Sequence, residues 1–202
     1  MKILFFASTY PHPSYPFSAF IKVLCEEMVV QGHEVIVVAP QSYSSILIKG
    51  AKRLPIDTTY TFPSESGIKK EIRGLRPYSI SFGQGKFRRL TWIANRLAAE
   101  LIVNRKGLLI DVLYAHFWNN AYNALYIAKR MCKPLFVATG EDHIIAGKVL
   151  SSKVKKQMTN TVQGVICVST KNKNESILAG LTNESKCIVL PNAVNPSVFH
   201  VK

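Results

Sequence analysis

The sequence contains no long apolar run. Its two longest uninterrupted runs, residues 3–7 and 35–39, have five residues each, whereas a membrane-spanning helix needs roughly 18 or more. The first ten residues hold a single Lys and only the first of these runs, which is too short for the apolar core of a signal peptide. The sequence therefore predicts no membrane span, and we expect a cytoplasmic location.

Cysteine is scarce and scattered. The four cysteines are separated by 107, 35 and 20 positions, and no two of them form a CxxC pair. Because a zinc site needs clustered ligands, we expect no metal, and the spacing favours isolated thiols in a reducing compartment. These residues are Cys25, Cys132, Cys167 and Cys187.

Two glycine-rich nucleotide motifs are also missing. The loop after the first apolar run has no GxGxxG, whose glycines let the backbone approach a pyrophosphate. The P-loop pattern GxxxxGK[ST] occurs nowhere in the chain. These absences argue against a NAD-dependent oxidoreductase and a P-loop enzyme, and we expect no cofactor.

Acidic residues are few, because 12 Asp and Glu stand against 26 Lys and Arg and give a formal net charge of +14. Residues 49–106 hold 13 of the basic residues and four of the acidic ones, so this segment carries +9 of the total. Such a field attracts nucleic acid, anionic lipid or phosphorylated substrates, unless it is merely a solvated face. The segment matches no nucleic-acid recognition module, so no nucleic-acid partner is expected.

What the sequence does contain is an alternation of apolar strands and amphipathic helices. Strands are expected at 3–7, 34–39, 112–115, 135–139, 164–168 and 187–190. Helices are expected from 18 to a stop at 32, and at 86–104, 119–131, 145–157 and 172–179. Residues 41–85 are harder to interpret, with weak strand candidates at 58–62 and 68–72. This order predicts an α/β, Rossmann-like, doubly wound and mostly parallel sheet flanked by helices, in one domain.

The helix expected at 86–104 is amphipathic. Its apolar residues share one face, while Arg88, Arg89 and Arg96 lie elsewhere. The apolar face consists of Phe87, Leu90, Ala94, Leu97 and Leu101.

Ligands of open parallel sheets bind beyond the carboxyl ends of the strands, which selects the loops 8–17, 116–120, 140–144, 169–171 and 191–195. The most polar is Gly140-Glu141-Asp142-His143, where two carboxylates and an imidazole could bind sugar hydroxyls or act as acid and base. Alternatively, Asp142 caps the following helix and Glu141 is solvated.

Aromatic residues follow another strand. His116, Phe117 and Trp118 combine rings with polar groups, as stacking on a sugar requires. The alternative is that these rings pack beneath a loop.

Six segments stand out in order along the chain. They are MKILFFASTYPHP, GHEVIVVAP, DVLYAHF, PLFVATGEDHI, GVICVS and IVLPNAVNPSVF. Together they resemble the N-terminal domain of family 4 glycosyltransferases, which are retaining enzymes of GT-B architecture. The resemblance covers nearly the whole chain, although residues 41–107 match poorly.

The resemblance implies two Rossmann-like domains facing a cleft, with the acceptor received by the N-terminal one and the nucleotide-sugar bound by the C-terminal one. Residues 1–202 would be the acceptor-side domain, inactive without the donor domain that lies outside them. The implied partners are a nucleotide-sugar donor and a glycan or lipid-linked acceptor. No catalytic residue is assigned. The implied substrate-binding residues are His116, Trp118, Thr139, Gly140, Glu141, Asp142, His143, Ser18 and Asn192.

The chain departs from the family pattern at three places. Tyr15, Pro16 and Ser18 occupy a region where the family often has glycine near the donor diphosphate. Thr139 stands where a His commonly touches the donor sugar. Ala193 replaces the glycine of an Asn-Gly-Val-Asp turn and lacks its freedom at positive φ.

A second class of function stays open. The basic segment could belong to a non-catalytic module that docks on an anionic membrane or on a partner protein. Such a module would lie peripherally on the inner face of the membrane rather than free in the cytoplasm.

Overall fold

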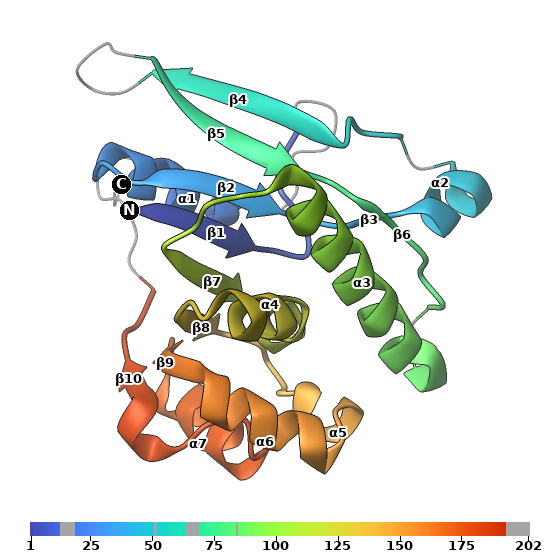
Figure 1. Ribbon diagram of the computed structural model, residues 1–202. Coiled ribbons are helices and arrows are strands. Elements are labelled where there is room, and N and C mark those ends of the chain that lie inside the picture. Colours follow the sequence, from blue (N-terminus) through green and yellow to red (C-terminus); the bar gives the residue numbers. More distant parts are fainter. Residues whose placement is uncertain (13–18, 51, 64–68, 84, 193–202) are drawn as a thin grey trace, which may run out of the picture.

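A computed structural model of the chain describes residues 1–12, 19–50, 52–63, 69–83 and 85–192. The main sheet contains β1 (Lys2–Phe6), β2 (Glu34–Val38), β4 (Asp57–Pro63), β5 (Lys69–Leu75), β7 (Val112–His116), β8 (Leu135–Thr139), β9 (Val162–Cys167) and β10 (Cys187–Val189). Its strand order is β10-β9-β8-β7-β1-β2-β5-β4 (Figure 1), and β3 (Gln41–Ser42) and β6 (Tyr78–Ser79) form a separate pair. Neighbouring strands of the main sheet run parallel except β4 and β5.

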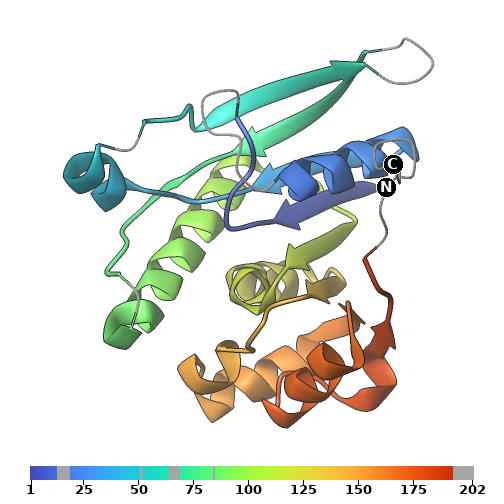
Figure 2. The same cartoon turned by 180° about the vertical axis from the view of Figure 1, so that it is seen from behind.

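Helices cover both faces of this sheet. They are α1 (Ala19–Val30), α2 (Tyr43–Lys49), α3 (Arg88–Lys106), α4 (Trp118–Met131), α5 (Ala146–Val149), α6 (Ser152–Thr161) and α7 (Thr170–Leu178), with 3-10 turns η1 (Gly85–Phe87) and η2 (Glu184–Lys186). Helices α3 and α4 lie in front of the sheet in Figure 1, whereas α1 lies in front of β1 and β2 in the opposite view of Figure 2. The predicted α/β, Rossmann-like architecture is confirmed.

Strand β1 shows how the sequence builds two cores. Successive side chains of a strand point to opposite faces of its sheet. Leu4 and Phe6 accordingly join the cluster that contains α3 and α4, while Ile3 and Phe5 join the cluster that contains α1. Because helices cover both faces, the strand is a continuous apolar run rather than an alternating one.

The predicted helix at 145–157 is wrong in one respect, because two helices occupy this range. Helix α5 ends at Val149, and α6 begins at Ser152. Leu150 and Ser151 between them are extended, with ψ angles of 139° and 157°. The side chain of Leu150 is buried in the main core, so this break lets the chain bury an apolar residue between the helices.

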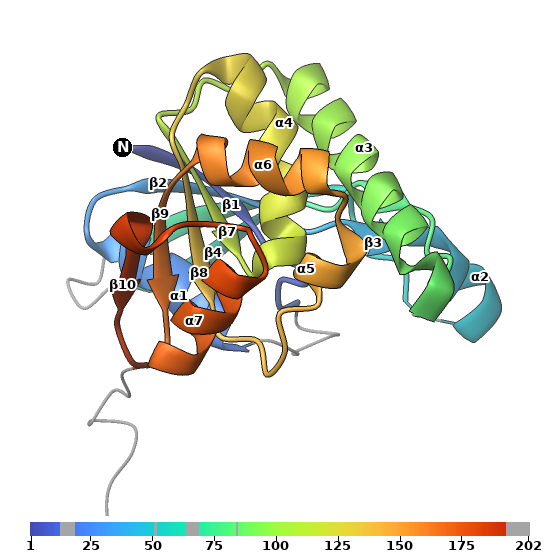
Figure 3. The same cartoon turned by 90° about the horizontal axis from the view of Figure 1, so that it is seen from below.

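Helix α3 differs from a usual amphipathic helix in what it buries. The expected apolar face points to solvent, since Leu97 and Leu101 are 51% and 67% exposed. The face packed on the sheet side carries Ala99, Ile102 and Val103. Figure 3 shows α3 at the outer side of the helix layer, beyond α4 and α6. An apolar stripe is therefore left uncovered.

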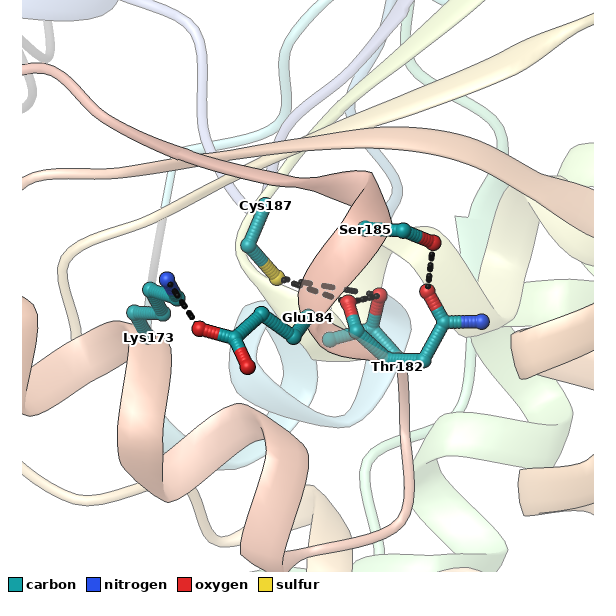
Figure 4. Close-up of polar contacts among 6 residues, drawn as sticks. Lys173, Thr182, Glu184, Ser185 and Cys187 are labelled. Atoms are coloured by element: carbon teal, nitrogen blue, oxygen red, sulfur yellow. Dashed lines mark hydrogen bonds and ion pairs between the residues drawn. The ribbon is translucent and has the colours of Figure 1, made fainter.

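All four cysteines are free. The Sγ of Cys187 lies 3.3 Å from the carbonyl oxygen of Asn183 and 3.8 Å from the hydroxyl of Thr182 (Figure 4). Lys173 of α7 forms an ion pair of 2.9 Å with Glu184 in the same turn. These contacts tie the turn before β10 to α7.

Candidate functional site

The carboxyl ends of the parallel strands meet at one edge of the sheet. In the register of the sheet, His116 of β7 pairs with Ala138 of β8, and Thr139 pairs with Cys167 of β9. The loops that follow β7, β8 and β9 are therefore neighbours (Figure 1). Seven of the nine predicted residues lie in the loop after β8 or in elements that border the loops after β7 and β8.

Glu141 is the structural centre of this edge. Its carboxylate accepts a hydrogen bond of 2.8 Å from the backbone N–H of Trp118 and another from the hydroxyl of Thr139. Trp118 is the first residue of α4, and the preceding Phe117 provides no side-chain cap. From the loop after β8, Glu141 thus caps the N-terminus of α4 and stabilises the positive end of that helix.

The alternative prediction for this loop, a solvated Glu141 and a capping Asp142, is wrong. The helix that follows the loop has no side-chain cap. Burial raises the pKa of Glu141, and the hydrogen bonds from Thr139 and Trp118 oppose that rise. The half-buried carboxyl is thus held in place by its partners.

Trp118 does not offer a ring to a sugar. The side chain is fully buried, and its indole N–H donates a hydrogen bond of 3.0 Å to the hydroxyl of Ser176 in α7. The prediction of a stacking ring is wrong for this residue, because α4 lies between the sheet and neighbouring helices that enclose its first turn. The alternative prediction of a packed ring is correct in that the ring is buried, but it packs against α7 rather than beneath a loop.

His116 is half-buried at the end of β7. Its ring lies 4.2 Å from the ring of Phe117 and 5.2 Å from that of Phe20, measured between centroids. Burial lowers the pKa of His116 to about 4, so the imidazole is neutral at pH 7. Its Nδ1 has no hydrogen-bond partner among the described residues. This Nδ1 is buried, so the neutral imidazole would bind a hydroxyl through its other ring nitrogen.

The remaining loop residues are more open. Asp142 and His143 are exposed. The Nζ of Lys171 donates to the carbonyl of Asp142 at 2.9 Å, which fixes the backbone and leaves the carboxylate outward. A Cβ on Gly140 would stand 3.2 Å from both methyl groups of Val168, so glycine suits this close approach of two loops.

Two predicted residues are not brought to this group. Ser18 lies outside the described residues. Asn192 is exposed beyond β10, at the far end of the strand order, and no described contact joins it to the other predicted residues.

Sequence reasoning missed a polar link between β1 and β7. The hydroxyl of Ser8, just after β1, accepts hydrogen bonds from the side-chain amides of Asn119 at 2.9 Å and Asn120 at 3.1 Å. The amide of Asn120 also donates to the carbonyl of His116. Adjacent asparagines in the first turn of the helix after β7 were the available signal.

A pocket adjoins this link. It has a volume of about 300 Å³, and it lies at the ends of β1 and β2, bounded by α2 and the segment that follows it. Its lining includes Ser8 and two cations, Lys52 and Arg76. Arg76 was missed because the strand expected at 68–72 extends to Leu75, which places Arg76 at a carboxyl end.

The family of this chain follows from a direct comparison. A family model described as Glycosyltransferase Family 4 matches residues 18–198. The chain belongs to glycosyltransferase family 4. A comparison with curated protein sequences finds no match.

Several solved structures share the fold of this chain. Sucrose-phosphate synthase from Thermosynechococcus elongatus is 11% identical, with a TM-score of 0.63 over 96% of this chain and 91% of that chain. The catalytic domain of starch synthase IV from Arabidopsis thaliana, bound to ADP and acarbose, is 11% identical, with a TM-score of 0.56 over 97% of this chain and 52% of that one. Anabaena HepE in complex with UDP and glucose is 14% identical, with a TM-score of 0.56 over 100% of this chain and 47% of that one.

The family 4 chain therefore has the fold of the N-terminal, Rossmann-like domain of a GT-B glycosyltransferase, as its sequence predicts. It spans about half the length of the starch synthase domain and of HepE. Within the described residues, no helix is both long and apolar enough to cross a membrane.

Proposed function

We propose that this domain is the acceptor-binding half of a retaining glycosyltransferase. The enzyme would transfer a sugar from a nucleotide-sugar to a glycan or lipid-linked acceptor, with the donor bound by a second domain outside residues 1–202. The family match over residues 18–198 carries this proposal. Structures of the same fold hold ADP with acarbose or UDP with glucose, which supports a nucleotide-sugar as the donor class.

The acceptor contacts that we propose are His116, Gly140, Asp142 and His143. The neutral imidazole of His116 and the outward carboxylate of Asp142 can each bind a sugar hydroxyl. Thr139 and Glu141 position this loop and do not touch the substrate, while Ser18 and Asn192 stay predictions. Transfer with retention depends on positioning and on stabilisation of the leaving diphosphate, so this half needs no strong base.

The proposal is tested by separating binding from transfer. The 202-residue chain is expected to release no UDP from UDP-glucose and to release UDP in the presence of acceptor once a family 4 donor domain is joined to it. Asp142→Ala should raise the acceptor KM of the joined enzyme, whereas Asn174→Ala, an exposed position on α7, should not. Turnover by the 202-residue chain alone would contradict the division of labour.

A specific observation favours membrane docking as a second role of the same domain. The exposed apolar stripe consists of Leu90, Leu97 and Leu101 of α3 and of Phe87 in the preceding turn η1. Exposed cations, among them Lys86 and Arg89, lie on the same stretch of chain. A helix with an apolar face and flanking cations can lie in the interface of an anionic bilayer. This role would place the lipid-linked acceptor beside the site.

Vesicle sedimentation tests whether the α3 surface docks on a membrane or is merely exposed to solvent. We expect binding to vesicles of phosphatidylglycerol and phosphatidylcholine that weakens as salt is raised. The double variant Leu97→Ser, Leu101→Ser should lose this binding. Leu178→Ser, an 86% exposed position on α7, is the matched control and should keep it. Equal binding of both variants would remove α3 from the docking surface.

A further inference from the structure

Arg76 is a buried cation with an unusual set of partners. It is 2% exposed and follows β5 at the carboxyl edge of the sheet. Its Nη2 donates hydrogen bonds to the carbonyl oxygens of Tyr10 at 3.0 Å and Pro11 at 3.4 Å. Its guanidinium carbon lies 5.1 Å from the ring centre of Tyr60 and 5.9 Å from that of Tyr10. The two rings contact each other, with centroids 5.2 Å apart, and the guanidinium lies beside this pair.

Among the described residues, no carboxylate forms an ion pair with this cation. None of the ion pairs of the described residues includes Arg76, and its buried Nη1 has no hydrogen-bond partner there. A buried charge without a counterion is costly, and aromatic rings offset only part of that cost. A ligand that supplies the missing negative charge would offset the rest of that cost.

The space for that ligand is the pocket of about 300 Å³ beside Arg76, a volume at the lower end of small-molecule sites. Lys52 lines the same pocket, together with the hydroxyl-bearing residues Ser42 and Ser45. The pKa of nearby His12 is lowered mainly by partial burial and further by the positive charges of Arg76 and Lys52. The two cations thus act on one region.

The pocket is built on a fixed frame. The side-chain amide of Gln41 donates to the carbonyls of Leu54 and Arg76 at 2.9 and 3.0 Å, and its oxygen accepts from the N–H of Leu54 at 3.2 Å. This amide fastens the segment that carries Lys52 to the end of β5. A Cβ on Gly74 would lie 2.8 Å from Cε2 of Tyr60, so glycine permits the close packing beneath Arg76.

We infer that this pocket binds a phosphate group of the acceptor, with Arg76 and Lys52 as its cationic contacts. Guanidinium and ammonium groups are the usual partners of phosphate, which brings nearly two negative charges and three acceptor oxygens. Ser8 both lines the pocket and meets Asn119 and Asn120, so the acceptor's sugar would extend from the pocket toward His116. This inference rests on the proposed function, because it names the chemistry of the acceptor.

The phosphate could belong to a sugar phosphate within a glycan or to a polyprenyl phosphate carrier. The test measures affinities of the 202-residue chain by calorimetry at constant ionic strength, with no transfer required. The probes are glucose 1-phosphate, farnesyl phosphate, glucose and UDP. Binding of glucose 1-phosphate without glucose binding supports the inference, and tighter binding of farnesyl phosphate assigns the phosphate to a lipid carrier.

Variants locate the binding. Arg76→Gln should weaken phosphate binding by about tenfold or more, since a hydrogen-bonded charge pair is lost, and Lys52→Gln, at an exposed residue, should weaken it by about threefold. Arg73→Gln, on the strand that precedes Arg76, is the matched control, because Arg73 pairs with Asp57 outside the pocket. It should change affinity less than about twofold. Lys52→Gln keeps the test valid if Arg76→Gln does not fold.

Three results would overturn the inference. In the first, neither glucose 1-phosphate nor farnesyl phosphate binds. In the second, all three variants keep the full affinity for phosphate esters, which marks an adventitious ion only. The third is UDP binding that Lys52→Gln abolishes and with which glucose 1-phosphate does not compete. That result would assign the pocket to the donor. Failure of transfer in the joined enzyme alone would count against the proposed function and not against this pocket.

Discussion

Two ionisable side chains at the carboxyl edge of the sheet differ in whether the described protein provides their partners. Glu141 accepts hydrogen bonds from Trp118 and Thr139, so its partners lie within the protein. Arg76, at the end of β5, shows no ion pair in the described part of the chain and keeps an unpartnered Nη1. The first arrangement is complete as it stands, whereas the second lacks an anion.

The difference separates structural from ligand-binding residues. A buried polar group whose partners are all internal costs stability when one partner is removed. A buried charge that lacks a partner costs stability while it is present, so its removal is tolerated in the absence of ligand. Sequence alone favoured Glu141 as the site residue, and the contacts point to Arg76.

The largest loss of stability is expected for a substitution in α4, the helix that Glu141 caps. Trp118→Ala should lower the free energy of unfolding by about 3–5 kcal/mol, because it leaves a cavity beneath the edge and an unpaired Ser176. Urea denaturation measures this loss. Trp92→Ala, at a half-buried residue of α3, is the control and should cost less. A small loss at Trp118 would mean that the ring is free to meet a ligand.

A smaller effect should distinguish the two neighbouring carboxylates. Glu141→Ala should cost about 2–3 kcal/mol, since it leaves the N–H of Trp118 and the hydroxyl of Thr139 without an acceptor. Asp142→Ala, at an exposed side chain, should change stability by less than about 0.5 kcal/mol. Denaturant midpoints of both variants measure the contrast, and equal losses would show that Glu141 is no cap.

The sequence was sufficient for the sheet because each buried strand is a local apolar run. Residues 3–7 and 34–39 correspond to β1 and β2 within one residue at each end. Prediction was weaker where charge interrupts the pattern, as in β5, whose Lys70 and Arg73 disguise a strand that reaches Leu75. The carboxyl end of that strand, and Arg76 with it, therefore escaped notice.

The site was harder to predict because its contacts join distant residues. The burial of Trp118 depends on Ser176, 58 positions away, and Glu141 caps a helix 23 positions before it. No local pattern carries that information. The loops were identified correctly from the strand ends, but the roles of individual side chains in them were not.

Acid should weaken the fold through His116. Burial lowers its pKa from 6.5 to about 4, so the unfolded state binds more protons between these values and stability falls as the pH falls through this window. The raised pKa of Glu141 acts in the opposite sense, and its contribution is lost as the pH rises above 4.5. His116→Gln should therefore flatten the loss between pH 6.5 and 5, as urea unfolding at each pH would show.

His143 provides the control for this pH dependence. His143→Gln changes an exposed imidazole in the neighbouring loop and should leave the slope of stability against pH as it is in the unaltered protein. If His143→Gln flattens the slope and His116→Gln does not, the buried imidazole is not the titrating group.

The smallest change is expected where the charge is most deeply buried. Arg76→Met loses hydrogen bonds to the carbonyls of Tyr10 and Pro11, but it also removes a buried cation that has no described counterion. These effects oppose each other, so stability in chloride buffer should stay within about 1 kcal/mol of the unaltered protein. Adding inorganic phosphate at constant ionic strength should then raise the melting temperature of the unaltered protein and not that of the variant. A loss of stability as large as that of Glu141→Ala would mean that the protein already compensates the charge of Arg76. Arg76 and Glu141 would then not differ in the way proposed here.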